Sequence, residues 1–299
     1  MVNPSKGSRR IRFTIAVCLA LAGSPPLQAQ SFASDRISVV ARGSGPDVIM
    51  VPGVAGHREE AWGGVIETLD DRYRLHLVQV NGFAGAPAGA NTEGEVAAPV
   101  ATEIARYIRG TDLERPAVIG HSMGGAVGMM MAARDPDLVE RLMVVDMMPY
   151  LGDVFAPPGT PPEGIRAMAD QIHADILASP PGGGMLGQMF PTMTLRTDLV
   201  PMLMRHVRES DPRTMAAAFR ELIVTDLRPE LARITAPVTV LYVQSPEVPL
   251  PPEQFDAEVA RLYANVPRAR LVRFDQSRHF LQWDQPERFV TEVDAFMAR

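Results

Sequence analysis

The sequence predicts an α/β fold with a mostly parallel, doubly wound sheet and an inserted helical segment. Short apolar runs rich in β-branched residues alternate with longer helix-like runs on both sides of the middle of the chain. Such alternation is typical of β-α-β units, because parallel strands need a crossover connection. The rhythm stops between Met147 and about Arg233, where proline and glycine clusters separate short helical pieces. With 299 residues, 46% of them hydrophobic, the chain can form one core, residues 31–146 and 234–299, around an insertion at residues 147–233.

Residues 1–30 are predicted to be a leader that is not part of this fold. A basic stretch (Lys6, Arg9, Arg10 and Arg12) precedes the apolar run Phe13–Gly23, which is too short to span a bilayer comfortably. Pro25-Pro26 ends the run, and small residues follow. This order is typical of a secretory signal peptide cleaved between about residues 29 and 33, with an uncleaved N-terminal anchor as the alternative. We therefore expect an exported protein, periplasmic or secreted.

Charge and cysteine usage limit the expected partners of the mature chain. The only cysteine, Cys18, lies in the leader, so no disulfide or thiolate ligand is expected after cleavage. The leader carries four positive charges and no negative ones, so its removal changes the net charge from −6 to −6 − 4 = −10. A charge of this sign argues against nucleic acid and anionic membrane surfaces as partners. We expect no stable membrane insertion after leader removal, and the oligomeric state stays open.

Each strand is predicted from a short apolar run that ends at a glycine, proline or polar cluster. The first two strands flank the turn Gly43-Ser44-Gly45-Pro46, and the second ends in Pro52-Gly53. In chain order the predicted strands are Ile37–Arg42, Asp47–Val51, Leu75–Val80, a run that starts at Ala117, Leu142–Val145, Val238–Val243 and Arg270–Phe274.

The helices are predicted from apolar residues at helical spacing. In Glu95–Arg109 these residues recur every four positions from Val96 to Ile108, which gives an amphipathic helix. The run Ala126–Arg134 is apolar all round, as expected of a helix buried against a sheet. Glu253–Ala264 is a further helix. The final helix is expected to start at Asp284, with Glu287 three residues on as in a variant capping box.

The segment Gly120-His121-Ser122-Met123-Gly124 separates the apolar run from Ala117 from the helix-like run after it. This is the G-x-S-x-G pattern of a nucleophile elbow in strand–turn–helix context. Ser122 needs a very sharp turn, and the two glycines allow the backbone to approach itself closely. At these residues the sequence resembles the α/β-hydrolase superfamily, in its serine esterase and lipase-like branch with a cap. The resemblance covers nearly the whole chain after the leader.

The resemblance implies the α/β-hydrolase fold, with the insertion at residues 147–233 as a helical cap. It also implies a base for Ser122, because a serine hydroxyl is a weak nucleophile until an imidazole takes its proton. Of the six histidines, His279 alone lies after the last strand and before the final helix, where the family has its catalytic base. The oxyanion hole is expected from the backbone N–H groups of Val54 and Met123. Val54 follows Pro52-Gly53, at the position of the usual His-Gly motif.

The acid that orients His279 has two candidates. Most of the family carries it in a Gly-x-x-Asp loop after the penultimate strand, but here the loop 243–249 has no Asp. Asp146 ends the strand after the elbow helix, a position that some branches of the superfamily use. Glu247 lies in the usual loop, with a side chain one bond longer than that of Asp. Both candidates stay open on the sequence.

Two features bear on the substrate. Phe83, in the glycine-rich loop 81–87, is expected near the mouth of the site, where it either lines the acyl pocket or packs the loop. Nine of the 17 methionines fall between Met147 and Met215. They predict either a surface that adapts to irregular apolar ligands or a small methionine-filled cap core.

The sequence thus predicts a carboxylesterase-like serine hydrolase that cleaves esters of small to medium apolar acyl groups through an acyl-enzyme. Lactone hydrolysis, carbon–carbon bond hydrolysis and acyl transfer would use the same triad. A non-enzymatic ligand-binding protein of the same fold is the other class; the missing Gly-x-x-Asp favours it, while Ser122 and His279 oppose it. We expect no metal and no cofactor, because neither a His-Glu-x-x-His pattern nor a phosphate-binding glycine motif occurs.

Overall fold

The structure is a computed structural model that describes residues 1–2, 32–111, 113–157, 159–244, 246 and 248–299. The chain divides into two units, residues 1–30 and 31–299, of which the second contains the fold. The predicted leader falls almost entirely outside the described residues, as does Glu247. Among the residues described, no helix is both long and apolar enough to cross a lipid bilayer.

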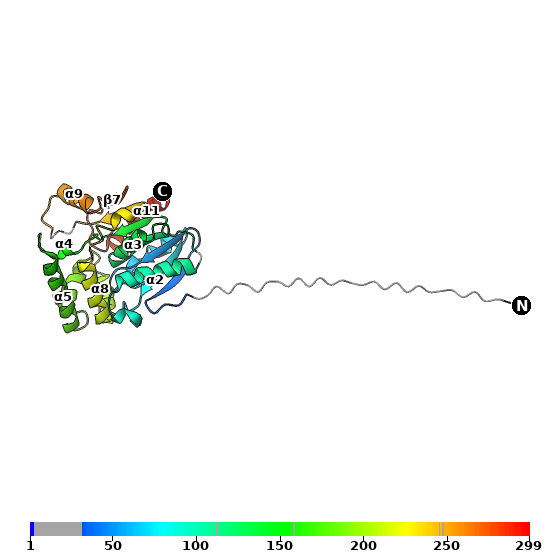
Figure 1. Cartoon of the computed structure of the whole chain (residues 1–299), viewed down its shortest axis with the longest axis horizontal. Coiled ribbons are helices and arrows are strands. Elements are labelled where there is room, and N and C mark those ends of the chain that lie inside the picture. Colours follow the sequence, from blue (N-terminus) through cyan, green and yellow to red (C-terminus); the bar gives the residue numbers. More distant parts are fainter. Residues whose placement is uncertain (3–31, 112, 158, 245, 247) are drawn as a thin grey trace. The chain divides into compact units, whose positions relative to one another are not determined.

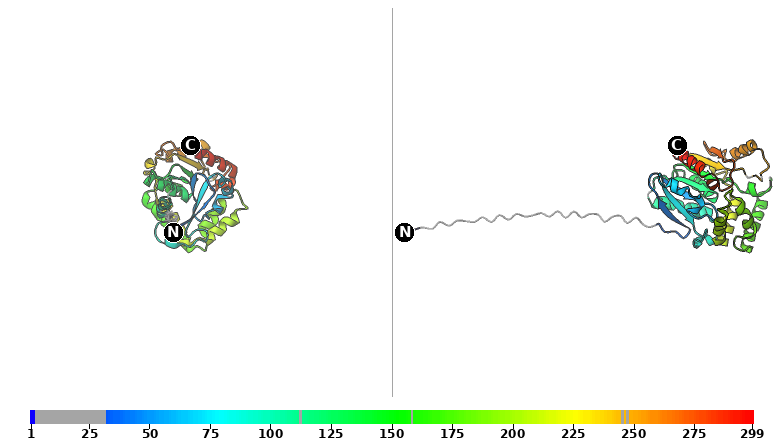
Figure 2. Two further views of the ribbon diagram at one scale, coloured as in Figure 1. Left: turned by 90° about the vertical axis from the view of Figure 1, so that its right-hand side faces the viewer. Right: turned by 180° about the vertical axis from the view of Figure 1, so that it is seen from behind.

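A seven-stranded sheet forms the centre of the unit 31–299, in the order β1-β3-β2-β4-β5-β6-β7. β1 pairs with β3 in antiparallel fashion, and every other pairing is parallel. In Figures 1 and 2 the blue N-terminal strands and the orange strand β7 lie at opposite edges. The strands are β1 Ile37–Arg42, β2 Asp47–Val51, β3 Arg74–Val80, β4 Ala117–His121, β5 Leu142–Val145, β6 Val238–Tyr242 and β7 Arg270–Arg273. The predicted mostly parallel sheet is confirmed.

Alternate residues of the central strands enter two separate hydrophobic cores, one on each face of the sheet. In β2, Ile49 and Val51 join the core that contains α2 and α3, whereas Val48 and Met50 join the core that contains α11. This two-residue period follows from strand geometry, and burial on both faces explains the uninterrupted apolar runs. The flanking helices are η1 Glu60–Trp62, α1 Ile66–Leu69, η2 Gly89–Thr92, α2 Ala97–Gly110, α3 Met123–Arg134, α9 Pro252–Leu262, α10 Leu281–Asp284 and α11 Pro286–Met297.

Between β5 and β6 the described residues form helical segments and turns, and α5 packs along α8 at the lower left of Figure 1. The segments are α4 Gly152–Phe155, α5 Pro162–Ala178, α6 Gly184–Met189, η3 Phe190–Thr192, α7 Val200–Glu209, α8 Pro212–Val224 and η4 Leu231–Arg233. The helical insertion into the α/β core is therefore as predicted.

A buried carboxylate attaches this insertion to the core. Glu221 of α8 accepts hydrogen bonds from the backbone N–H groups of Val96, Ala97 and Ala98, at 2.6, 2.7 and 2.8 Å, at the start of α2. These N–H groups have no partner within their own helix, and the helix dipole favours a negative charge there. Burial raises the pKa of Glu221, while the three donors act in the opposite direction. The helix α2 is thus capped by a residue more than a hundred positions away in the sequence.

The prediction that Asp284 starts the final helix was wrong. Asp284 ends the short helix α10, and α11 begins at Pro286 without a side-chain cap from Gln285. The carboxylate of Asp284 accepts instead from three donors: the backbone N–H of Arg278, the hydroxyl of Thr194 and the backbone N–H of Leu195. The carboxylate of Asp284 therefore bonds to the loop before its own helix and to a segment about 90 residues away, and it does not cap α11. The other predicted element ends agree within a few residues, as helix and strand ends usually do.

Candidate active site

Ser122 lies on a sharp turn between β4 and α3. Its backbone has φ +53° and ψ −121°, a region that costs energy for a residue with a Cβ. Its N–H donates to the carbonyl of Val145 at 2.9 Å, and its carbonyl accepts from Gly125 at 2.7 Å. A Cβ at Gly120 would lie 2.1 Å from the carbonyl oxygen of Gly124, a contact no side chain tolerates. Gly120 is thus needed because the backbone of the turn folds back on itself, and Gly124 because a Cβ there would lie 2.0 Å from the carbonyl oxygen of Val51 at the end of β2.

The loop after β2 presses against the same serine. A Cβ on Gly53 would lie 2.9 Å from Cβ and 3.3 Å from Oγ of Ser122. Val54, the next residue, is buried and lines the cavity described below. Met123 follows Ser122 as the first residue of α3, with its side chain in the core. Of the two expected oxyanion donors, Val54 thus follows the residue that approaches Ser122, and Met123 follows Ser122 in the sequence.

Asp146 and His279 form a close pair. Nδ1 of His279 lies 2.6 Å from Oδ2 of Asp146, and a carboxylate partner makes Nδ1 the protonated nitrogen. The other oxygen of Asp146 accepts from the N–H of Val243 at 3.0 Å, and its own N–H donates to the carbonyl of Leu241 at 2.7 Å. Asp146 thus turns away from the end of β5 with φ +48° and is held by β6. This arrangement leaves Nε2 of His279 for another partner.

The residue before the serine also contacts the His279 segment. Nε2 of His121 lies 3.0 Å from the backbone carbonyl of His279, and the centroids of the two imidazole rings are 4.7 Å apart. Burial, followed by the nearby His279, holds the pKa of His121 well below its ordinary value, so the ring is neutral. Its Nδ1 is buried without a partner among the described residues. His121 therefore supports the loop that carries His279. The G-x-S-x-G pattern did not predict this contact, because it allows any residue at the position of His121.

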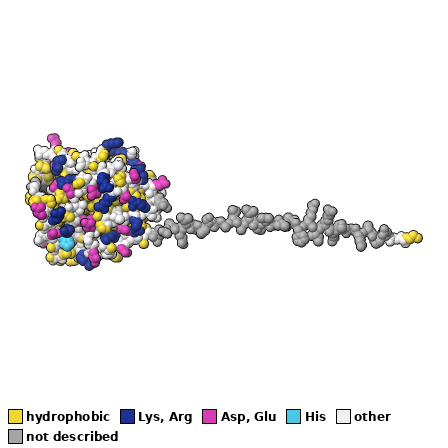
Figure 3. Space-filling model, viewed as in Figure 1, with side chains coloured by type: hydrophobic (Ala, Val, Ile, Leu, Met, Phe, Trp, Pro, Cys, Tyr) yellow, Lys and Arg dark blue, Asp and Glu magenta, His cyan; other side chains and the backbone are white. Residues whose placement is uncertain are grey.

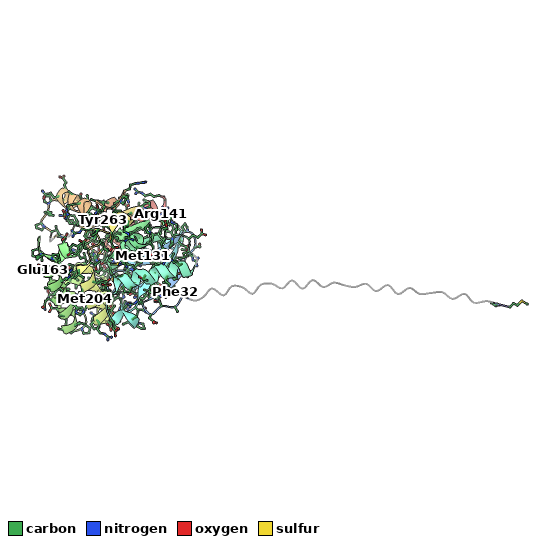
Figure 4. The ribbon with its side chains drawn as sticks, viewed as in Figure 1. Phe32, Met131, Arg141, Glu163, Met204 and Tyr263 are labelled. Carbon is green, nitrogen blue, oxygen red and sulfur yellow. The ribbon has the colours of Figure 1, made fainter. Side chains whose placement is uncertain are left out.

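Tyr263, labelled in Figure 4, fixes the start of the insertion next to Asp146. The tyrosine is almost fully buried and donates its hydroxyl to the carbonyl of Met147 at 2.5 Å. Burial, followed by the charge of Asp146, raises the pKa of Tyr263, so the hydroxyl keeps its proton and acts as a donor. No spacing in the sequence pointed to this residue, since it follows α9, 116 positions after the group it bonds.

A cavity of about 580 Å³ contains this pair and the serine. Ser122, Asp146 and His279 line it together with Val54, while the rest of its wall is mostly apolar. Four methionines contribute to that wall, so part of the methionine-rich insertion faces a ligand-sized space. The apolar lining residues of the insertion are Met147, Met148, Leu151, Val154, Phe155, Met189, Phe190, Met193, Phe219 and Leu222.

The other sequence candidates are placed as follows. Phe83 is fully buried in the core and is not among the residues that line the cavity. Glu247 lies outside the described residues.

On the face shown in Figure 3, basic and acidic side chains are mixed with apolar ones rather than gathered by sign.

Residues 48–292 match the alpha/beta hydrolase family. The chain belongs to this family. Among curated proteins, it is 27% identical to a pimeloyl-[acyl-carrier protein] methyl ester esterase of Nitrosomonas europaea, over 87% of this chain and 98% of that protein. It is 29% identical to an uncharacterized protein of Mycobacterium tuberculosis, over 91% and 81%. Among solved structures, an esterase from Exiguobacterium antarcticum superposes on this α/β-hydrolase with a TM-score of 0.73 at 20% identity, covering 88% of this chain and 96% of that one. The last likeness concerns the fold.

Proposed function

We propose that the protein is a serine hydrolase that cleaves carboxylic esters through an acyl-enzyme. One observation carries the proposal: Ser122, on its strained turn, shares a cavity with a His279 whose Nδ1 is bonded to Asp146. A nucleophile, a base and a group that orients the base are the three parts that acyl transfer by serine requires. Membership of the alpha/beta hydrolase family supports the same chemistry.

In this mechanism Oγ of Ser122 attacks the ester carbonyl while Nε2 of His279 takes its proton. The N–H groups of Val54 and Met123 stabilise the oxyanion of the tetrahedral intermediate. The alcohol leaves with the proton from His279, and the acyl group stays on Ser122. Water then attacks the acyl-enzyme by the same route and releases the acid. Asp146 holds the tautomer of His279 and stabilises the imidazolium that forms in each half-reaction.

The cavity supports a proposal for the substrate class. Its volume lies within the range of small-molecule sites, and its wall of methionine, leucine, valine and phenylalanine side chains offers few hydrogen bonds. A neutral acyl chain gains free energy when it leaves water for such a wall, whereas a charged chain loses its hydration. We therefore propose esters of small to medium apolar acids as substrates.

The test is hydrolysis of p-nitrophenyl esters of graded chain length by protein that starts near Ser34. The wild type should turn over, and the chain length with the highest kcat/KM should report the extent of the cavity. Ser122→Ala should lose turnover, because the nucleophile is gone. Folded wild type that neither hydrolyses any ester nor reacts at Ser122 with a fluorophosphonate would contradict the proposal and favour a ligand-binding protein.

We further propose that the protein acts outside the cytoplasm after removal of residues 1–30. The basic stretch, short apolar run and small residues of the leader support this localisation. The test is expression of the full chain, cell fractionation and N-terminal sequencing of the product. A mature N-terminus between about residues 29 and 33 in the exported fraction is expected. An intact leader on cytoplasmic protein would contradict it.

A further inference from the structure

The loop that carries His279 is held on both sides of the histidine, by Asp284 of α10 on one side and by the helical insertion on the other. On one side, the N–H of Arg278 donates to Oδ2 of Asp284 at 2.7 Å. On the other, the N–H of Phe280 donates to the carbonyl of Met193 at 3.0 Å. The backbone of the proposed base is thus fixed by one carboxylate and by one carbonyl of the insertion.

The same carboxylate also bonds to the insertion. Oδ1 of Asp284 accepts from the hydroxyl of Thr194 at 2.7 Å and from the N–H of Leu195 at 2.9 Å. Thr194 is only 5% exposed, so water competes little for this contact. Hydrogen bonds to a carboxylate are stronger than neutral ones. Asp284 therefore joins the His279 loop to the segment Met193–Leu195, positions that lie about 90 residues apart in the sequence.

The joined segment forms part of the cavity wall. Phe190 and Met193 line the cavity from the insertion, and His279 and Phe280 line it from the core. A ligand that packs against Met193 thus contacts the segment that Asp284 holds against the base. No cap of α11 uses the side chain of Asp284, so its two oxygens serve these contacts.

We propose that Asp284 is a positioning residue. Through its hydrogen bonds to Arg278 and Thr194 it holds the backbone of His279 at a fixed position relative to the cavity wall. The inference rests on the proposed ester hydrolysis. Asp146 fixes the imidazole at Nδ1, whereas Asp284 fixes the backbone from which the ring projects. A displacement of about 1 Å at a reacting group is enough to slow a reaction by about a hundredfold. Loss of the Asp284 contacts therefore lowers kcat, while KM for a given ester changes little.

The experiment compares Asp284→Asn, Thr194→Val and Thr194→Ser, with the double variant Asp284→Asn/Thr194→Val. Thr194→Val keeps the shape of the side chain and removes the hydroxyl, which donates to Asp284 and accepts from the N–H of Arg196, whereas Thr194→Ser keeps the hydroxyl. Asp198→Asn is the matched control, because Asp198 is an exposed carboxylate of the same region that pairs with Arg196. Activity is expressed per site titrated with a fluorophosphonate, so that a misfolded fraction does not count.

We expect kcat to fall about fivefold in Thr194→Val and about tenfold or more in Asp284→Asn, in line with the loss of hydrogen bonds to a charged group. Thr194→Ser and Asp198→Asn should stay within about twofold of the wild type. The double variant should be no slower than Asp284→Asn, since both changes break the same link.

Three results would overturn the inference: wild-type kcat in both Asp284→Asn and Thr194→Val, equal losses in Thr194→Val and Thr194→Ser, or losses that multiply in the double variant. Each of these leaves ester hydrolysis by the wild type intact. Failure of the wild type to hydrolyse any ester would instead contradict the proposed function, so the two failures are distinguishable.

Discussion

Asp146 and His279 lie 133 residues apart in the sequence, yet Oδ2 of Asp146 is 2.6 Å from Nδ1 of His279. The contact depends on β6, which neither residue belongs to. β6 lies between the strand that Asp146 follows and the strand that precedes the His279 loop. At its carboxyl end it binds both the N–H and the second carboxylate oxygen of Asp146. The direction of the Asp146 side chain is therefore set by hydrogen bonds across the sheet.

This geometry predicts that Asp146 rather than Glu247 is the triad acid. Asp146→Asn should lower kcat about 10³- to 10⁴-fold, because an amide stabilises the wrong tautomer of His279 and does not stabilise the imidazolium. Glu247→Gln is the matched control and should stay close to the wild type. Steady-state hydrolysis of a p-nitrophenyl ester measures both. A large loss in Glu247→Gln with an active Asp146→Asn would reverse the assignment.

The close approach of Gly53 to Ser122 predicts that Gly53→Ala inactivates the site. The new methyl group would lie 2.9 Å from Cβ of Ser122, so either the serine or the loop with Val54 must move. We expect kcat/KM to fall about a hundredfold, with a loss of stability of about 1–3 kcal/mol from overpacking. Gly110→Ala is the control, since a Cβ there meets nothing within 4 Å at the end of α2. Equal activity of the two variants would show that the loop adapts.

Because three histidines are buried, we predict that the free energy of unfolding decreases in mild acid. Burial is the main cause that lowers the pKa of His76, His121 and His206 from 6.5. The unfolded chain therefore binds these protons at a higher pH than the folded one. Stability is fully present above about pH 6.5 and decreases as the pH falls below it. Urea unfolding at pH 7.5, 6.5 and 5.5 measures the slope.

His121→Gln tests the share of this slope that belongs to His121. Glutamine has no titratable group and keeps a donor near the carbonyl of His279, so the slope between pH 6.5 and 5.5 should be smaller in the variant. An unchanged slope would mean that other groups control the acid response.

The contact between Glu221 and the start of α2 predicts a large cost for its removal. Glu221→Ala leaves three backbone N–H groups without their acceptor in a buried place, and we expect a loss of about 2–3 kcal/mol in the free energy of unfolding. Glu95→Ala is the control, because Glu95 is an exposed carboxylate just before the same helix. Chemical denaturation compares them. Equal midpoints would show that water replaces the carboxylate.

The sequence by itself determined the strand–helix alternation, the insertion between Leu142–Val145 and Val238–Val243, and the turn at Ser122. These features are local: a strand buried on both faces must be apolar along its length, and a turn as sharp as that at Ser122 needs glycine at Gly120. The resemblance to the family also indicated His279, because the segment around it is similar to the one that carries the family's base. Such signals need no knowledge of which segments meet.

Only the tertiary structure decided which distant groups share a hydrogen bond. The sequence left Asp146 and Glu247 open, placed Asp284 at the start of a helix, and gave no sign that Glu221 caps α2. In each case the sequence around the carboxylate did not specify its hydrogen-bond partner. The partner depends on which strands and helices lie side by side in the fold. A carboxylate binds whichever donors the fold brings to it, and the cost of leaving buried donors unpaired makes that choice strict.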